Sequence, residues 1–182
     1  FAFKFNKIII ESFYFPKKEY LKICLKCKLI PSKYSNIFDF NIKENNLFQD
    51  NKRIEFKNLL SKVDNQDKFI QFLLLNLYKD MPESYLENFD MIKNFYLPFA
   101  KKKKIIFSMT SVFRNDNFKI YLAETKKVGS KYFHSVHGGG IPIRDAFFFF
   151  YLEKISDKII KWDKTEKNNL FVNLSPTLPV IK

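Results

Sequence analysis

The sequence has few glycines, cysteines and arginines. Two cysteines among 182 residues are too few for a disulfide-rich secreted scaffold. Cys24 and Cys27 form a single C-x-x-C, and a zinc site would need a second pair or nearby histidines at ligand spacing. We therefore interpret both cysteines as buried, reduced thiols within a helix. No carboxylate pair stands at metal-binding spacing, so we expect neither a metal nor another cofactor.

Long hydrophobic runs are also missing. The longest apolar blocks, residues 72–75 and 146–152, are far shorter than the ~18–20 residues of a transmembrane helix. The first residues alternate with Lys and Asn and show no cleavage-site pattern, so no signal peptide is visible. We expect a cytoplasmic protein. Because the chain starts at Phe1 and ends after a linker-like segment, we interpret it as part of a longer protein.

The formal net charge is +13, from 32 basic and 19 acidic residues. Such an excess is typical of proteins that bind nucleic acids or anionic membranes. Only three basic residues are arginines, however, and nucleic-acid readers usually rely on Arg because its planar fork matches phosphates and guanine edges. The chain is rich in Lys, Asn, Ile and Phe, which have A/T-rich codons, so we attribute most of the charge to genome composition. The positive charge still favours a phosphorylated donor or an anionic membrane face.

The first half of the chain reads as one extended stretch followed mainly by helices. Residues 1–15 are aromatic and β-branched, which predicts an extended segment, and a helix is expected over 16–28. Residues 31–51 have no sustained period and are expected to form a loop with at most one short element. Residues 67–78 predict a helix with a broad apolar face, which implies burial on more than one side. A second helix is expected over 82–96, ending at Leu97-Pro98.

The second half alternates strand and helix patterns. The expected order is a strand at 104–110, a helix at 115–127, a strand at 130–136, a helix at 145–156 and a strand at 158–162. This β-α-β-α-β order predicts an α/β fold with a Rossmann-like parallel sheet and helices on both faces.

These patterns predict that the chain is divided into three segments. Residues 1–98 form an N-terminal strand and helices that pack on the sheet, residues 99–163 form the Rossmann-like core, and residues 164–182 form a linker toward a missing second domain. Within the core, the spacing of Phe118, Tyr121, Leu122 and Thr125 predicts the inner face of a helix. The other residues that we expect to point toward the core lie on the helices at 82–96 and 145–156: Tyr85, Leu86, Phe89, Ile92, Phe148, Tyr151, Leu152 and Ile155. Gly129 suits the residue after a helix end.

Ligands of such sheets bind beyond the carboxyl ends of the strands. The first core strand ends at Ser108, Thr110 and Ser111, and the third at Trp162 and Asp163. The second strand leads to His137-Gly138-Gly139-Gly140, which holds three of the four glycines in the chain. Glycine permits close approach of a ligand to backbone amides, so this turn is a candidate anion site. It lacks the Gly-Lys-Ser/Thr of a Walker loop, and Ile143 breaks the dinucleotide fingerprint.

His137 is the candidate catalytic residue. An imidazole at the mouth of the sheet titrates near neutral pH and could accept a proton from an acceptor hydroxyl. The alternative is a histidine that only hydrogen-bonds the turn. His134 lies inside a strand pattern and is interpreted as structural.

The motifs between residues 105 and 162 resemble a family of transferases from bacterial O-antigen and other surface-polysaccharide gene clusters. The matching pieces, in order, are Ser108-Met109-Thr110, Asn115-Asp116-Asn117-Phe118-Lys119, Ala123-Glu124, Val136-His137-Gly138-Gly139-Gly140, and Ile155-Ser156-Asp157 with Trp162. Upstream, Met81-Pro82 and Tyr85-Leu86-Glu87-Asn88-Phe89 resemble the same family. The chain departs from the family pattern at Val136, at Ile141-Pro142 and around Trp162.

The resemblance implies the N-terminal half of a GT-B-like glycosyltransferase, with two Rossmann-like domains and an active site between them. Its partners would be a nucleotide-sugar or similar activated donor and a glycan or lipid-linked acceptor, with peripheral contact at the inner membrane face and no specific nucleic acid. The resemblance adds Asn115, Lys119 and Asp157 to the substrate-binding candidates, although Asp157 also suits a helix C-terminal turn. The turn at residues 137–142 is also similar to the His-Gly-x-Pro turn of CDP-glycerol glycerophosphotransferases, whose histidine acts on the acceptor hydroxyl.

Two other interpretations stay open. The chain could be a basic, aromatic-rich module that binds single-stranded nucleic acid or an anionic surface. It could also be a truncated and inactive remnant, because a domain without its partner cannot close a cleft. Under the transferase interpretation, too, this chain is expected to be inactive by itself.

Overall fold

One parallel sheet organises the protein. The computed structural model describes residues 7–11, 16–29, 38, 49–100, 105–136, 147–161 and 170–173. Within them, neighbouring strands pair in the order β1-β2-β3-β4-β5, and every pair is parallel. The strands are β1 (Ile8–Glu11), β2 (Ile105–Ser108), β3 (Lys131–Ser135), β4 (Lys158–Lys161) and β5 (Phe171–Asn173).

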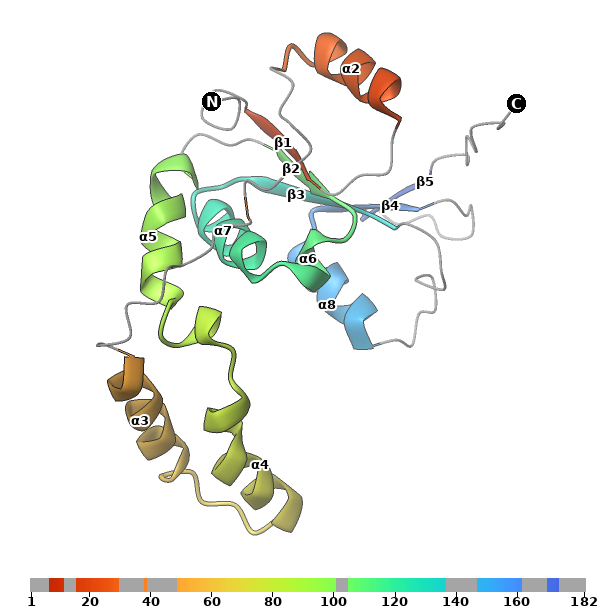
Figure 1. Cartoon of the computed structure of the whole chain (residues 1–182). Helices are drawn as coiled ribbons and strands as arrows, with labels where there is room; N and C mark the ends of the chain where they lie inside the picture. Colours follow the sequence, from red (N-terminus) through yellow and green to blue (C-terminus); the bar gives the residue numbers. More distant parts are fainter. Residues whose placement is uncertain are drawn as a thin grey trace.

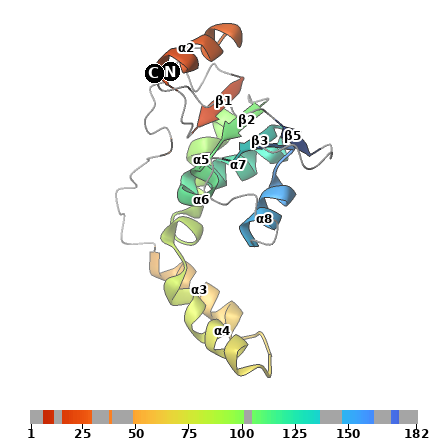
Figure 2. The same ribbon diagram turned by 90° about the vertical axis from the view of Figure 1, so that its right-hand side faces the viewer.

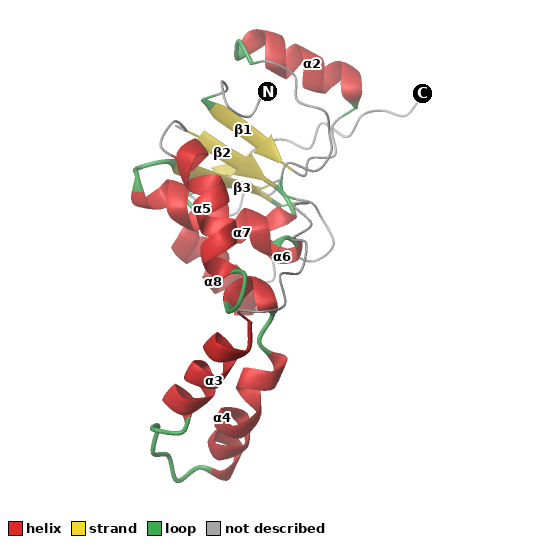
Figure 3. Cartoon of the chain, turned by 60° about the vertical axis from the view of Figure 1, so that its left-hand side comes forward, coloured by secondary structure: helices red, strands yellow, loops and turns green. Residues whose placement is uncertain are grey.

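Helices cover both faces of this sheet (Figure 1). Helix α2 (Lys17–Lys26) lies on one face, and α5 (Phe89–Ala100), α7 (Asp116–Lys127) and α8 (Phe147–Ile155) lie on the other (Figure 3). Strands that follow one another across a sheet through right-handed crossovers place their crossover helices on the same face, which accounts for α7 and α8. The predicted α/β fold with a Rossmann-like parallel sheet is confirmed.

The sheet is wider than the three strands predicted for the core. β1 comes from the extended N-terminal stretch and pairs with β2, so that Ile9 lies opposite Ile106. β5 falls within residues 164–182, where only a linker was expected, and it pairs with β4.

The main core lies between the sheet and helices α5, α7 and α8. The predicted inner face of α7, formed by Phe118, Tyr121, Leu122 and Thr125, is buried as expected. On α8, Leu152 is buried, but Tyr151 is exposed and the expectation that it points inward was wrong. The strands and α5 contribute further large members of this core: Ile9, Ile106, Tyr132, Ile159, Ile92 and Tyr96.

A smaller apolar cluster lies between α2 and the opposite face of the sheet. Tyr20 and Cys24 of α2 are buried in it, with Ile10 of β1 and Phe107 of β2 packed against them. Both cysteines are free thiols, and Cys27 is exposed, so the expectation that both are buried was wrong for Cys27. Cys27 is the cap residue after α2 ends at Lys26, so the helical spacing that buries Tyr20 and Cys24 does not extend to its side chain.

Both ends of α7 follow local sequence signals. The Asn115 side-chain oxygen accepts a hydrogen bond of 2.9 Å from the Phe118 amide, which satisfies a free N–H of the first turn. After the helix ends, Gly129 adopts a φ of 87°, a conformation that glycine takes without a Cβ clash.

The single helix expected over 82–96 is instead a short 3-10 turn, η1 (Glu83–Tyr85), followed by α5. The expected end at Leu97-Pro98 was also wrong, because α5 continues through Pro98 to Ala100. Pro98 is in the last turn of α5, where its missing N–H removes one hydrogen bond without disrupting earlier turns. The buried residues Ile92, Tyr96 and Ala100 recur every four positions, so tertiary packing holds the last turn in place.

Helices α3 (Gln49–Leu60) and α4 (Lys68–Asp80) form a hairpin that projects away from the sheet (Figures 1 and 2). The predicted helix at 67–78 is confirmed as α4, and the Asp67 side chain caps it by accepting from the Phe69 and Ile70 amides. The expectation that α4 is buried on more than one side was wrong, because none of its residues is buried. α3 packs along one side of α4 only.

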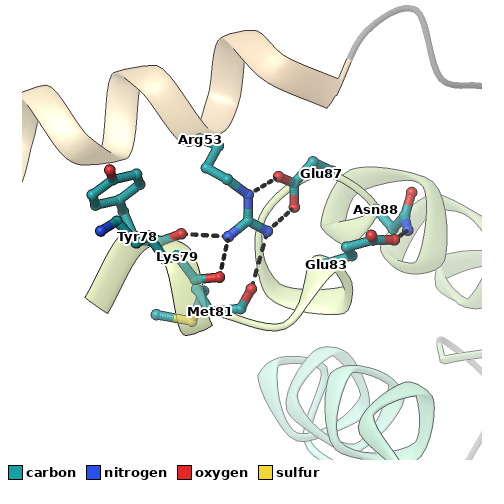
Figure 4. Close-up of polar contacts among 7 residues, drawn as sticks. All are labelled: Arg53, Tyr78, Lys79, Met81, Glu83, Glu87 and Asn88. Carbon is teal, nitrogen blue, oxygen red and sulfur yellow. Dashed lines mark hydrogen bonds and ion pairs between the residues drawn. The ribbon is translucent and has the colours of Figure 1, made fainter. Parts of the chain in front are cut away.

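Arg53 joins the two helices of this hairpin to the turn that leads back to the sheet (Figure 4). Its guanidinium donates two hydrogen bonds, of 2.6 and 2.9 Å, to the Glu87 carboxylate. It also donates to the backbone carbonyls of Tyr78, Lys79 and Met81 at the end of α4. The Glu87 side chain is only 4% exposed, and the guanidinium supplies hydrogen bonds to both of its carboxylate oxygens.

Arg53→Ala is expected to destabilise the protein by about 2–3 kcal/mol, because it leaves the buried Glu87 carboxylate without its partner. Urea denaturation measures the loss, and hydrogen exchange should show that amides of α3 and α4 become less protected while β2 and β3 do not. Lys52→Ala is the matched control, because Lys52 makes an exposed ion pair with Asp90. Equal stability losses in the two variants would contradict the role of Arg53.

Candidate functional site

The carboxyl ends of the strands define the candidate site. Because all pairs are parallel, these ends lie along one edge of the sheet. The residues at this edge are Glu11, Ser108, Ser135, Lys161 and Asn173. Open parallel sheets bind ligands at this edge, so we call it the ligand edge.

Small hydroxyl side chains gather at the ligand edge. The predicted candidates Ser108, Thr110 and Ser111 follow one another at the end of β2, and all three are buried. Ser135 adds a fourth buried hydroxyl at the end of the adjacent strand β3. Thr110 precedes the short helix α6 (Ser111–Arg114), and its side chain makes no capping hydrogen bond to that helix. The structure therefore brings together the three predicted hydroxyls and one that was not predicted.

A chain of buried polar groups leads from Ser108 into the core. The Ser108 hydroxyl lies 2.9 Å from the Tyr132 hydroxyl, which lies 3.1 Å from Nδ1 of His134. Burial raises the pKa of Tyr132, so this phenol stays protonated near neutral pH. His134 is fully buried and packs edge-on against Phe113. These contacts fit the interpretation of His134 as a structural residue.

The predicted catalytic turn begins where the described part of β3 stops. The Val136 amide donates a 3.0 Å hydrogen bond to the Ile160 carbonyl, so the chain still runs beside β4 at this point. His137, Gly138, Gly139 and Gly140 follow next in the sequence and lie outside the described residues, as do Trp162 and Asp163. Their roles stay predictions.

Lys161 is a candidate that the sequence analysis missed. It ends β4 beside β3, and it is only 5% exposed although lysine is rarely buried. The signal was present in the alternation of β4, where Lys161 shares the buried face with Ile159. A lysine buried at the ligand edge supplies positive charge where an anionic substrate would be bound.

Two predicted substrate-binding residues lie at the start of α7, and both have structural contacts. Asn115 caps the helix. Lys119 donates a 2.8 Å hydrogen bond to Asp116, whose carboxylate also accepts from the Tyr85 and Ser84 hydroxyls at 2.9 Å. Burial opposes both charges, yet these hydrogen bonds lower the pKa of Asp116 and raise the pKa of Lys119. Lys119 would have to leave Asp116 to bind a substrate.

Asp157 lies away from the other candidates. It precedes β4 and accepts a 2.8 Å hydrogen bond from the amide of Tyr132 near the start of β3, which places it at the opposite edge of the sheet. Its carboxylate also accepts from Lys126 at 2.7 Å and from Lys131 at 3.1 Å. Desolvation would raise the pKa of Asp157, but these three donors outweigh it and the pKa is lowered. The structure does not bring Asp157 to the ligand edge.

Asp157→Asn is expected to lower the free energy of unfolding at pH 7 by about 1–2 kcal/mol, since it weakens charge-assisted hydrogen bonds. Because the folded pKa of Asp157 is lowered, its stabilisation is present above the unfolded pKa of about 3.9 and is lost as pH falls through the folded pKa. Urea denaturation of wild type and variant should therefore give curves that converge in acid. A stability difference that stays constant from pH 7 down to about 2 would contradict this role.

Within the part of the chain that the structure describes, no helix has both the length and the apolar character needed to cross a membrane. No cluster of three or more His, Cys, Asp or Glu side chains in the same residues has a metal-binding arrangement.

The comparisons with known proteins identify one family. Neither the curated proteins nor the solved structures contain a match to the chain. A family model described as LIC12162 family transferase matches residues 1–179. The match includes the β2-to-β4 region with its ligand edge and also the α3–α4 hairpin. Since it spans nearly the whole sequence, the chain belongs to the LIC12162 family of transferases.

Proposed function

We propose that this chain forms part of the first Rossmann-like half of a GT-B-like transferase that builds surface polysaccharide, such as O-antigen, from a nucleotide-activated donor. The observation that carries the proposal is the ligand edge, where Ser108, Thr110, Ser111, Ser135 and Lys161 gather in a member of a transferase family. Hydroxyls and an ammonium group are hydrogen-bond donors for phosphate and sugar oxygens.

The electrostatics of the ligand edge suit an anionic substrate. Lys161 brings a positive charge into a poorly hydrated position, where its attraction for a phosphate is stronger than at an exposed site. In this proposal a second domain holds most of the nucleotide. The ligand edge holds the transferring group or the acceptor, and the glycine turn at residues 138–140 supplies backbone amides to the phosphate oxygens.

His137 is the general base in this mechanism. Its imidazole accepts the proton of an acceptor hydroxyl while the acceptor oxygen attacks the electrophilic centre of the donor. The bond between that centre and the phosphate oxygen breaks, and the nucleotide leaves with the electron pair. Lys161 and the turn amides stabilise the negative charge that develops on the leaving phosphate.

The acceptor in this proposal is a glycan or a lipid-linked glycan on the cytoplasmic side of the inner membrane. The net charge of +13 favours peripheral contact with an anionic membrane face. Binding of a specific nucleic acid is less well supported. Arg53, one of only three arginines, is held by Glu87, and Phe38 and Phe118 are buried in the core rather than displayed for base stacking.

His137→Ala, introduced into the complete product of the gene, is expected to reduce the transfer rate by about 10²–10⁴-fold, the usual contribution of a general base. The measurement is surface polysaccharide on cells that carry the variant in place of the wild-type gene, together with kcat of the purified protein.

Val128→Ala is the control, because Val128 is exposed at the end of α7 and precedes the start of β3, at the opposite edge of the sheet from the ligand edge. It should leave both readouts unchanged. Wild-type polysaccharide and kcat in His137→Ala would remove His137 from catalysis. Loss of surface polysaccharide with an unchanged kcat would point to a defect in folding or localisation within the cell.

A further inference from the structure

An exposed apolar stripe runs along α4 of the projecting hairpin. Phe69, Phe72, Leu73 and Leu77 form it, at spacings that place them on one face of a helix. We call these four residues the α4 stripe. Phe69 is 65% exposed and Phe72 is 60% exposed, so the stripe is a surface feature of the single chain.

Soluble monomers rarely expose a contiguous apolar stripe on a helix. Single exposed apolar residues are common, but contiguous apolar patches on a helix mark interaction surfaces. The hairpin projects from the sheet in every view, so no other described element of the chain lies against the α4 stripe (Figures 1, 2 and 3). Whatever covers the stripe is therefore outside the described part of this chain.

The charge of the hairpin argues against an anionic membrane as the occupant. Residues 49–80 contain six basic and five acidic side chains, a net charge of +1, whereas the whole chain carries +13. Interfacial helices that bind anionic lipids concentrate Lys and Arg on their polar face. The hairpin is thus nearly neutral in a strongly basic protein, which suits contact with another nearly neutral apolar surface.

We propose that the α4 stripe docks on the α4 stripe of a second copy of this chain, with the two helices antiparallel about a two-fold axis. In this arrangement Phe69 of one copy meets Leu77 of the other, and Phe72 and Leu73 meet their equivalents at the centre. Large side chains thereby face smaller ones at both ends. The two sheets lie at opposite ends of the resulting four-helix bundle, which separates the two basic bodies.

The size of the stripe is sufficient for such an interface. Burying the four side chains on both copies removes on the order of 800 Å² of apolar surface, from aromatic side-chain areas of about 150–250 Å² each. Contacts from flanking polar residues bring this to the ~1,200 Å² at the lower end of stable interfaces. We therefore expect a concentration-dependent dimer.

Sedimentation equilibrium of the full 182-residue chain tests the proposal. The wild type is expected to shift from the 21.9 kDa monomer to twice that mass across about 1–100 µM, a range that covers micromolar dissociation constants. Leu73→Glu and Phe69→Glu should each weaken the dimer at least tenfold, because they place a carboxylate in the interface.

Leu25→Glu is the matched control. Leu25 is a leucine of α2, on the other face of the sheet from α5 and α7, and it is 79% exposed. It should dimerise like the wild type, and circular dichroism confirms that all variants remain folded.

Three outcomes would overturn the proposal. The first is a wild type that stays monomeric over the whole concentration range, and the second is a dimer that Leu25→Glu disrupts as strongly as Leu73→Glu. The third comes from co-sedimentation with phosphatidylglycerol vesicles: binding that Leu73→Glu abolishes and Leu25→Glu preserves would identify a bilayer as the occupant. None of these outcomes depends on transferase activity, so the proposed function and this inference fail separately.

Discussion

Parallel pairing of β2, β3 and β4 determines where every candidate residue of this protein lies. Each strand returns through a helix to the same starting edge, so all carboxyl ends come together without any direct attraction between the residues there. Backbone hydrogen bonds and the core between the sheet and α7 hold this arrangement. The hydroxyls at the ends of β2 and β3 and Lys161 at the end of β4 are neighbours for that reason alone.

The two edges of the sheet have different chemistry. At the amino-terminal edge, the Asp157 carboxylate accepts hydrogen bonds from the Tyr132 amide, Lys126 and Lys131, which ties α7, β3 and β4 together. The ligand edge carries Ser108, Thr110 and other small hydroxyls instead. A rigid edge opposite the binding edge keeps the strand ends in position, which is the condition for a preorganised site.

The sequence predicted those elements whose signals are local. The apolar spacing of α7, its Asn115 cap and Gly129 all lie within one segment, and the structure confirms them. The same holds for the strand pattern of β2 to β4, from which the parallel sheet followed.

Properties that depend on distant partners were not predictable in the same way. The breadth of the apolar face of α4 indicated burial, but a sequence does not show whether the covering surface belongs to the same chain. The guanidinium contacts of Arg53 bring together residues 25 to 34 positions apart, and no local pattern marks them. Asp157 was a substrate-binding candidate by resemblance, whereas its position before β4 places it at the edge opposite the ligand edge. The alternation of β4 indicated that Lys161 is buried, but Lys161 was not among the predicted site residues.

The central claim is that the carboxyl edge of the sheet binds the phosphate of the substrate. Titrating isotopically labelled protein with inorganic pyrophosphate and following backbone amide signals by NMR tests it most directly. The account predicts saturable shifts at residues 108–111, 135–137 and 161 that persist at physiological salt, with none at residues 131 and 157. Shifts centred on residues 131 and 157, or changes spread evenly over surface lysines, would contradict it.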